Sequence, residues 1–206
     1  MRILYAVLAL AAMLSCDKTS DQKEQTPQEE ETPQINPETP TGKTLVVYYS
    51  FTGNCKTIAT SLAGYANADV LEILPAEEGL DYAANNYAIG SGLIAGIREK
   101  PSDPASYPAI KPVDKDAAGY DTVVIVTPLW WSNMAAIMQG YLFRNGEKLK
   151  DKNVGLIVSS ASSGISSVVA DAKRLVPDAK WIGEALWINN SNRSKSDALV
   201  KEWWKQ

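Results

Sequence analysis

Short runs of consecutive apolar residues alternate with amphipathic segments along most of the chain. The apolar runs are rich in β-branched and aromatic side chains and lie at residues 44–50, 70–74, 122–127, 154–159 and 181–188. This pattern predicts five buried strands. Between and after them, apolar side chains three or four positions apart, such as Ile58 and Leu62, lie on one helical face. The helices predicted in this way cover residues 54–65, 82–97, 135–143, 168–175 and 196–204.

Strands that alternate with helices predict an α/β fold, a doubly wound three-layer α/β/α sandwich around a parallel sheet. In such sheets, ligands bind beyond the carboxyl ends of the strands. We therefore expect the loops after the first, third and fourth strands to carry the function. The long stretch 75–118 either forms a lid beside that edge or is a helix with a long surface return.

The first 43 residues have a different composition from the rest of the chain. Arg2 precedes twelve apolar residues, 3–14, and Ser15 and Cys16 follow, which is typical of a secretory signal. The run MLSC resembles a bacterial lipobox, so residues 1–16 predict a lipoprotein signal peptide with Cys16 as the lipidated residue. The alternative is an ordinary signal peptide with a chance cysteine.

Residues 17–43 hold four prolines, seven acidic residues and one large apolar residue, Ile35. This composition predicts a disordered tether, and the alternative is an acidic binding tail. We expect a protein that is secreted across the inner membrane and faces the periplasm or the cell surface. Its contact with the membrane would be through the lipid anchor only.

Composition excludes several kinds of chemistry. The 206 residues include no histidine, which excludes Ser-His-Asp and Cys-His catalytic sites. The two cysteines, Cys16 and Cys55, are too few for a four-thiolate zinc site or a disulfide framework. The net charge is −4 and the acidic excess falls mainly in 17–43, so residues 44–206 show no basic footprint for nucleic acid. An enzyme with these side chains would need a cofactor.

The loop after the first strand is the strongest candidate for a binding site. Ser50, Thr52 and Asn54 surround Gly53 at the predicted start of a helix, and Cys55 follows. Free backbone N–H groups and hydroxyls at a helix start favour a phosphate group. The alternative is an ordinary N-capped turn.

Two further loops follow the third and fourth strands. The first contains Pro128, Leu129, Trp130, Trp131 and Ser132. Its adjacent tryptophans offer a stacking face for a flat ring, unless both pack beneath the loop. The second contains Ser160, Ala161, Ser162, Ser163 and Gly164. Its small polar residues would let a ligand approach the backbone, whereas the alternative is a flexible serine loop.

Together the three loops resemble the flavodoxin family. The segments that carry the resemblance are YYSFTGNCK, YDTVVIVTPLWWS and SSASSGI, and it covers residues 44–188. It implies a five-stranded parallel sheet in the order 2-1-3-4-5 within a domain at 44–206. It also implies one noncovalent FMN, with its phosphate between Ser50 and Cys55 on neutral donors, without an arginine. By position, Trp130 and Trp131 would border the isoalloxazine ring, and residues 160–164 its polar edge.

The resemblance implies electron transfer to a redox partner protein, or FMN-dependent reduction of a small quinone-like acceptor. It leaves open whether the protein is an enzyme or an electron carrier, and its oligomeric state. Four positions depart from the family pattern: Cys55 replaces a threonine, and Ser132, Ala161 and Ser162 replace glycines. If the paired glycines that Ala161 and Ser162 replace adopt positive φ, this loop is strained or changes shape. These departures motivate the alternative, a non-catalytic lipoprotein that kept the fold, lost flavin and acts as a binding module.

Two competing patterns are weaker. Residues 90–95 match a dinucleotide-binding string, but no strand is predicted before them, so this interpretation is disfavoured. Cys55 begins a helix, where a thiol can be reactive. We favour a buried replacement for threonine instead.

Overall fold

The computed structural model describes residues 42–206. The predicted signal peptide, the predicted lipidation site Cys16 and all but the end of the predicted tether lie outside the described residues. Every helix between residues 42 and 206 is too short or too polar to cross a membrane.

A parallel sheet forms the centre of the domain. Its strands are β1 (Thr44–Tyr48), β2 (Asp69–Glu72), β3 (Thr122–Trp130), β5 (Asn153–Ser159), β6 (Lys180–Trp181) and β7 (Leu186–Ile188). They lie in the order β2-β1-β3-β5-β6, and β7 also pairs with β5. All these pairings are parallel. The predicted α/β sandwich is therefore confirmed, and its strands follow the order 2-1-3-4-5 when β6 and β7 count together as the fifth.

The single fifth strand predicted at 181–188 is wrong in detail, because the segment forms two short strands. Gly183 lies between them with φ 57°, in the left-handed region that interrupts an extended strand. Lys180 of β6 pairs with Asn153 at the amino end of β5. Ile188 of β7 pairs with Ser159 at the carboxyl end of β5. Because of this break, β6 pairs with the amino end of β5 and β7 pairs with its carboxyl end.

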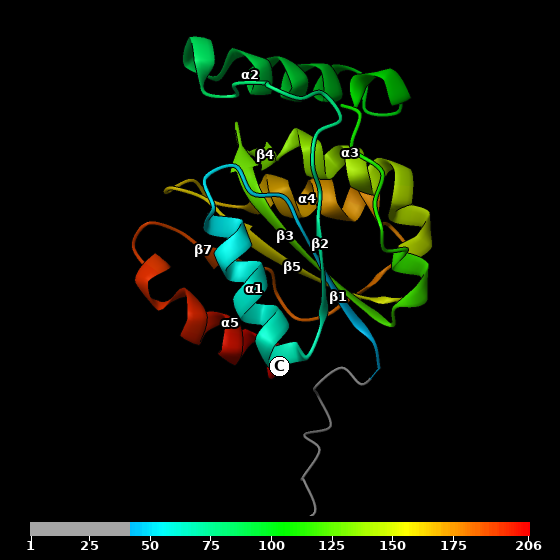
Figure 1. The fold of residues 1–206 in the computed structure, drawn as a ribbon, viewed down its shortest axis with the longest axis vertical. Helices are drawn as coiled ribbons and strands as arrows, with labels where there is room; N and C mark the ends of the chain where they lie inside the picture. Colours follow the sequence, from blue (N-terminus) through cyan, green and yellow to red (C-terminus); the bar gives the residue numbers. More distant parts are fainter. Residues whose placement is uncertain (1–41) are drawn as a thin grey trace, which may run out of the picture. The chain divides into compact units, whose positions relative to one another are not determined.

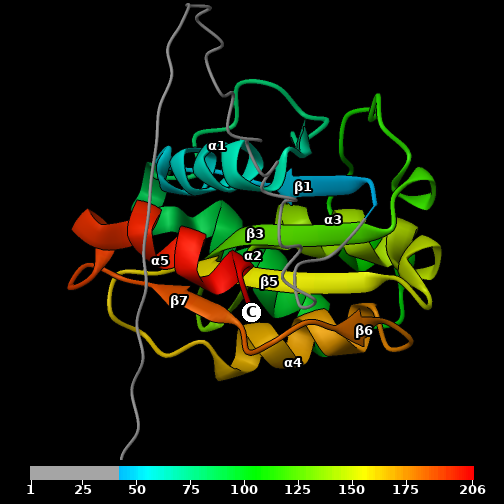
Figure 2. The same ribbon diagram turned by 90° about the horizontal axis from the view of Figure 1, so that it is seen from below.

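Helices cover both faces of the sheet (Figures 1 and 2). The α-helices are α1 (Asn54–Ala66), α2 (Ala84–Glu99), α3 (Ala136–Asn145), α4 (Ser166–Leu175) and α5 (Ser196–Trp204), and the short 3-10 helices are η1 (Pro104–Ser106), η2 (Ala117–Gly119), η3 (Gly146–Leu149) and η4 (Arg193–Lys195). One face carries α1 and α5, and the other carries α3 and α4, with α2 packed beside α3. Each predicted helix forms with boundaries that shift by a few residues, except that the start of α2 is not a regular helix. Asn85, Asn86 and Tyr87 have positive φ angles of 50°, 54° and 62°, so the right-handed part of α2 begins after them.

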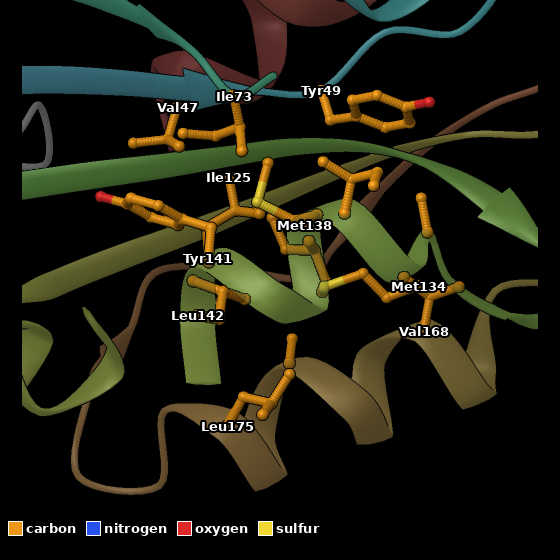
Figure 3. Close-up of a cluster of buried hydrophobic side chains, with 14 of the residues drawn as sticks. Val47, Tyr49, Ile73, Ile125, Met134, Met138, Tyr141, Leu142, Val168 and Leu175 are labelled. Atoms are coloured by element: carbon orange, nitrogen blue, oxygen red, sulfur yellow. The ribbon is translucent and has the colours of Figure 1, made fainter. Parts of the chain in front are cut away.

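Alternate strand residues divide between two hydrophobic clusters. Val46 and Val124 pack with α1 and α5, whereas Val47 and Ile125 pack with α3 and α4. Figure 3 shows the second cluster, in which Met138 of α3 lies against the sheet. A sheet buried on both faces requires continuous apolar strands, which explains the sequence pattern.

A tight turn follows β3, and it is formed by residues that such turns rarely contain. β3 and the short strand β4 (Asn133–Met134) form an antiparallel hairpin whose two turn residues are Trp131 and Ser132. Their φ angles are 46° and 66°. Two successive positive φ angles are typical of a hairpin turn that usually contains Asn and Gly. Ser132 therefore takes a strained conformation that the sequence analysis did not predict. The strain considered for Ala161 and Ser162 is absent, because neither residue has a positive φ angle.

Candidate functional site

A cavity of about 630 Å³ opens at the carboxyl edge of the sheet. Five segments line it: Ser50, Phe51, Thr52, Asn54 and Cys55 after β1; Tyr82, Tyr87 and Gly90 from the crossover and α2; Pro128, Leu129, Trp130 and Trp131 at the end of β3; Ser159, Ser160 and Ala161 at the end of β5; and Arg193 before α5. The three loops singled out in the sequence therefore meet at one edge. This size is typical of a small-molecule pocket.

The helix that follows the loop after β1 begins without a side-chain cap. Gly53 adopts φ 86° immediately before α1, and no side chain caps the helix start. The first helical hydrogen bond runs from Thr57 N to Gly53 O at 3.1 Å. The N–H groups of residues 54–56 thus have no acceptor within the helix. An uncapped helix start with a glycine in the left-handed region suits a bound anion.

Hydroxyl and amide groups surround this helix start. The Asn54 Nδ2 atom donates to Thr52 Oγ1 at 2.9 Å. The Ser50 Oγ atom is buried and has no hydrogen-bond partner among the described residues. A buried hydroxyl without a partner is costly, so a ligand oxygen at this place would satisfy it.

Cys55 begins the buried side of α1. Its side chain is 1% exposed, and burial raises the pKa of the thiol to about 12. The thiol therefore stays protonated at neutral pH and is a poor nucleophile. This supports the interpretation of Cys55 as a packed replacement for threonine.

The two adjacent tryptophans have different surroundings. Trp130 is 8% exposed, and its ring centroid lies 5.3 Å from that of Tyr82 and 5.5 Å from that of Tyr49. Trp131 is 39% exposed and meets the ring of Tyr87 edge-on at 6.4 Å. Both tryptophans line the cavity, Trp130 as part of an aromatic cluster and Trp131 near solvent.

Helix α2 approaches the tryptophans closely at Gly90. A Cβ atom at this position would lie 2.8 Å from Trp131 Cζ3, so only glycine fits without movement of the ring. Within the crossover 75–118, the helix thus forms part of the cavity wall. The string 90–95 lies inside α2 rather than after a strand, which removes the structural context of a dinucleotide-binding loop.

Side chains from two helices hold the strained turn. Arg98 of α2 donates from Nη2 to Trp131 O and from Nε to Asn133 Oδ1, the latter at 2.7 Å. Asp171 of α4 accepts at Oδ2 from Asn133 Nδ2 at 2.8 Å and from Met134 N at 3.0 Å. The turn geometry therefore depends on hydrogen bonds from outside the hairpin.

Asp171 is 8% exposed and is held in turn by Arg174, whose Nη2 lies 3.2 Å from Asp171 Oδ1. Arg174 also donates to Gln139 Oε1 and to Tyr107 Oη, both at 2.9 Å. A buried carboxylate with three donors is well satisfied, and removal of one partner would leave others unpaired.

The serine loop after β5 is anchored at its start. The Ser160 Oγ atom accepts from Trp187 Nε1 at 2.8 Å and donates to Ser163 O at 2.9 Å. Backbone bonds join Ser160 N to Ile188 O and Asn190 N to Ala161 O. A freely flexible loop therefore does not describe this part of the segment.

Five of the residues predicted for the site lie outside the cavity lining: Gly53, Ser132, Ser162, Ser163 and Gly164. Six residues that line the cavity were not among those predicted for the site: Phe51, Tyr82, Tyr87, Gly90, Ser159 and Arg193. Arg193 had an available signal, because it lies in the loop after the last strand at the same edge. Within residues 42–206, no group of three or more metal-ligating side chains comes together.

Comparison with known proteins assigns this chain to a family. A family model described as flavodoxin matches residues 43–206. The chain belongs to the flavodoxin family. A flavoprotein from Bacteroides eggerthii DSM 20697 is 27% identical, with a TM-score of 0.60 over 79% of this chain and 98% of that one. A flavoprotein from Bacteroides uniformis ATCC 8492 is also 27% identical, with a TM-score of 0.59 over 81% of this chain and 100% of that one.

A flavoprotein from Lactobacillus acidophilus NCFM, solved in complex with FMN, shares the fold. It is 21% identical, with a TM-score of 0.59 over 75% of this chain and 98% of that one. Among curated proteins, none matches this sequence.

Proposed function

We propose that this flavodoxin-family protein binds one FMN noncovalently in the cavity and uses it in redox chemistry. The observation that carries the proposal is the pairing of two features in one cavity. An uncapped helix start with the unpartnered Ser50 Oγ and a cluster of aromatic rings border the same cavity. These features suit the phosphate and the flat ring of FMN respectively.

At the phosphate end, the N–H groups of residues 54–56 and the hydroxyls of Ser50 and Thr52 would act as donors. At the ring end, Trp130 and Trp131 would provide stacking surfaces, and Ser160 and Ala161 would contact polar ring atoms. When bound, the flavin ring accepts and donates electrons, which is chemistry that the side chains of this chain lack.

The acceptor is either a redox partner protein or a small quinone-like compound. A carrier needs only an exposed ring edge, whereas a reductase also needs room for a second flat molecule over the ring, which an aromatic surface can border. Tyr82 and Tyr87 add such a surface, because they line the cavity from a separate segment and Tyr87 is 46% exposed. This arrangement favours the reduction of flat acceptors.

Purified full-length protein in detergent, titrated with FMN, tests the cofactor. Stoichiometric quenching of flavin fluorescence supports the proposal. Folded protein that binds no FMN supports the alternative, a flavodoxin-fold binding module without flavin. With bound FMN, anaerobic reduction followed by mixing with a soluble quinone then separates a reductase from a carrier: rapid reoxidation marks the reductase.

The proposed location rests on the sequence of the first 43 residues. We infer that Cys16 is lipidated and that the protein is secreted and anchored to a membrane through that lipid. When cells that express the wild type are fed a labelled fatty acid and fractionated, the protein should appear in the membrane fraction and carry the label. The Cys16→Ser variant should lose the label. Equal labelling of both proteins would contradict the anchor.

A further inference from the structure

Arg193 is the charged residue of the cavity wall. Among the described residues that line the cavity, all the others are uncharged: serines, threonine, asparagine, cysteine, aromatic and small apolar residues. A single positive charge in such a wall adds to the preference for an anion that the uncapped start of α1 already gives. Arg193 lies far from the phosphate-binding loop in sequence.

The fold brings Arg193 to the same rim as that loop. Helices α1 and α5 pack side by side (Figures 1 and 2), and both begin at the carboxyl edge of the sheet. Asp197 in the first turn of α5 accepts from Ser61 Oγ and Tyr65 Oη of α1, each at 2.6 Å. These contacts join α5 to the middle and end of α1. Arg193, four residues before Asp197, lines the same cavity as Thr52 and Asn54, which flank the start of α1.

The backbone that carries Arg193 is well fixed. The Arg193 N atom donates to Asn189 O at 2.8 Å, and the Asn189 N atom donates to Asn192 Oδ1 at 2.7 Å. The short helix η4 therefore presents the side chain from a defined position. A fixed backbone reduces the entropy that is lost when the guanidinium binds a ligand.

The guanidinium group itself has only a neutral partner. Its Nη2 donates to Asn190 Oδ1. Within residues 42–206, none of the ion pairs includes Arg193. An arginine without a carboxylate partner retains donors for an anion, and its planar fork suits phosphate oxygens.

We propose that Arg193 selects phosphorylated flavin, so that the protein discriminates FMN from riboflavin by the charge of the phosphate. The inference rests on the proposed function and deepens it. It adds a cationic partner to the uncharged phosphate donors expected from the family resemblance. FMN and riboflavin share the ring and the ribityl chain, so a residue that reads the phosphate affects only one of them.

The experiment compares FMN and riboflavin binding by fluorescence quenching in the full-length wild type, Arg193→Gln, Arg193→Lys and Lys195→Gln. Lys195 lies in the same short helix, is exposed and does not line the cavity, so its variant matches the charge change. Arg193→Gln should weaken FMN binding by about fivefold to tenfold and leave riboflavin binding within about twofold, because one charge-assisted contact is lost. Arg193→Lys should fall between wild type and Arg193→Gln, and Lys195→Gln should match wild type.

Salt provides a second readout. Higher ionic strength should weaken FMN binding to wild type more than to Arg193→Gln, because screening removes the same attraction. An unchanged ratio of FMN to riboflavin affinity in Arg193→Gln would overturn the inference while the proposed function stands. An equal loss of both flavins would overturn it too, since it would show a structural effect. Wild type that binds neither flavin would refute the proposed function and this inference together.

Discussion

Two buried hydroxyls in this domain allow a test in which stability and binding change in opposite directions. Ser50 Oγ and Thr122 Oγ1 each have less than 1 Å² of exposed surface and no hydrogen-bond partner within residues 42–206. Ser50 lines the cavity at the carboxyl edge of the sheet. Thr122 begins β3 and pairs with Thr44 at the amino edge. Both residues therefore have a buried hydroxyl without a hydrogen-bond partner, and they lie at opposite edges of the sheet.

Replacement of either hydroxyl by an apolar group of similar shape should stabilise the protein without FMN. An unsatisfied buried hydroxyl costs about 1–3 kcal/mol, and part of this cost is recovered when the group is removed. We expect Ser50→Ala and Thr122→Val each to raise the free energy of unfolding by about 1 kcal/mol. For a domain of this size, the melting temperature should rise by about 2–4 °C.

The two variants should differ in FMN affinity. If Ser50 Oγ donates to the phosphate, Ser50→Ala loses a hydrogen bond to a charged group, worth about 1.5–3 kcal/mol. The dissociation constant should then rise by about tenfold or more. Thr122→Val should leave it unchanged. Urea unfolding followed by tryptophan fluorescence measures stability, and flavin quenching measures affinity.

Two results would refute this reasoning. Unchanged FMN affinity in Ser50→Ala would remove the hydroxyl from the phosphate site. A loss of stability in Ser50→Ala beside a gain in Thr122→Val would show that Ser50 already has a partner in the unliganded protein, such as an ordered water.

Three further predictions concern the support of the site. Asp171→Ala should lower the free energy of unfolding, measured in urea, by about 3–5 kcal/mol, because a buried network loses its acceptor. The control Asp178→Ala removes an exposed ion pair with a 3.9 Å N–O distance and should lower it by less than about 1 kcal/mol. Gly90→Ala should shift tryptophan fluorescence and weaken flavin binding, because the new methyl group clashes with the ring of Trp131. The control Gly92→Ala has open space around it, so it should change neither property and should raise the free energy of unfolding by up to about 1 kcal/mol. Because the folded-state pKa of Cys55 is raised from 9.0 to about 12, the folded protein keeps a proton that the unfolded chain loses. The free energy of unfolding therefore falls as pH rises above about 9. Cys55→Ala should make this decrease less steep, by at most about 1.4 kcal/mol per pH unit. An identical pH dependence in the variant and the wild type would contradict the raised pKa of Cys55.

The sequence was sufficient to predict the sheet because burial on both faces leaves continuous apolar runs, as at β1, β3 and β5. It was not sufficient to predict the break in the last strand. Trp181 and Ile188 both continue an apolar pattern, and nothing in that pattern shows that Gly183 takes a left-handed conformation. Apolar content records burial, whereas backbone conformation at a glycine depends on what the neighbouring strand allows.

The meeting of the three loops at one cavity was predictable for a topological reason. The carboxyl ends of parallel strands meet at one edge, so polar loops after such strands come together. The aromatic residues Tyr82 and Tyr87 were not predictable in this way, because they lie in the long crossover between β2 and β3. Their distance from the cavity depends on how α2 packs against α3, which hydrophobic periodicity does not specify.

The turn after β3 shows how the chain manages without the glycine that the family pattern has at Ser132. A non-glycine residue in the left-handed region costs about 1–2 kcal/mol. Trp131 and Ser132 both adopt this conformation, and hydrogen bonds from Arg98 and to Asp171 hold the hairpin in place. The shape of the cavity beside Trp131 therefore depends on α2 and α4 rather than on the turn alone. A change in either helix should alter flavin binding without any contact with the flavin, which is the reason to expect Asp171→Ala to weaken binding as well as stability.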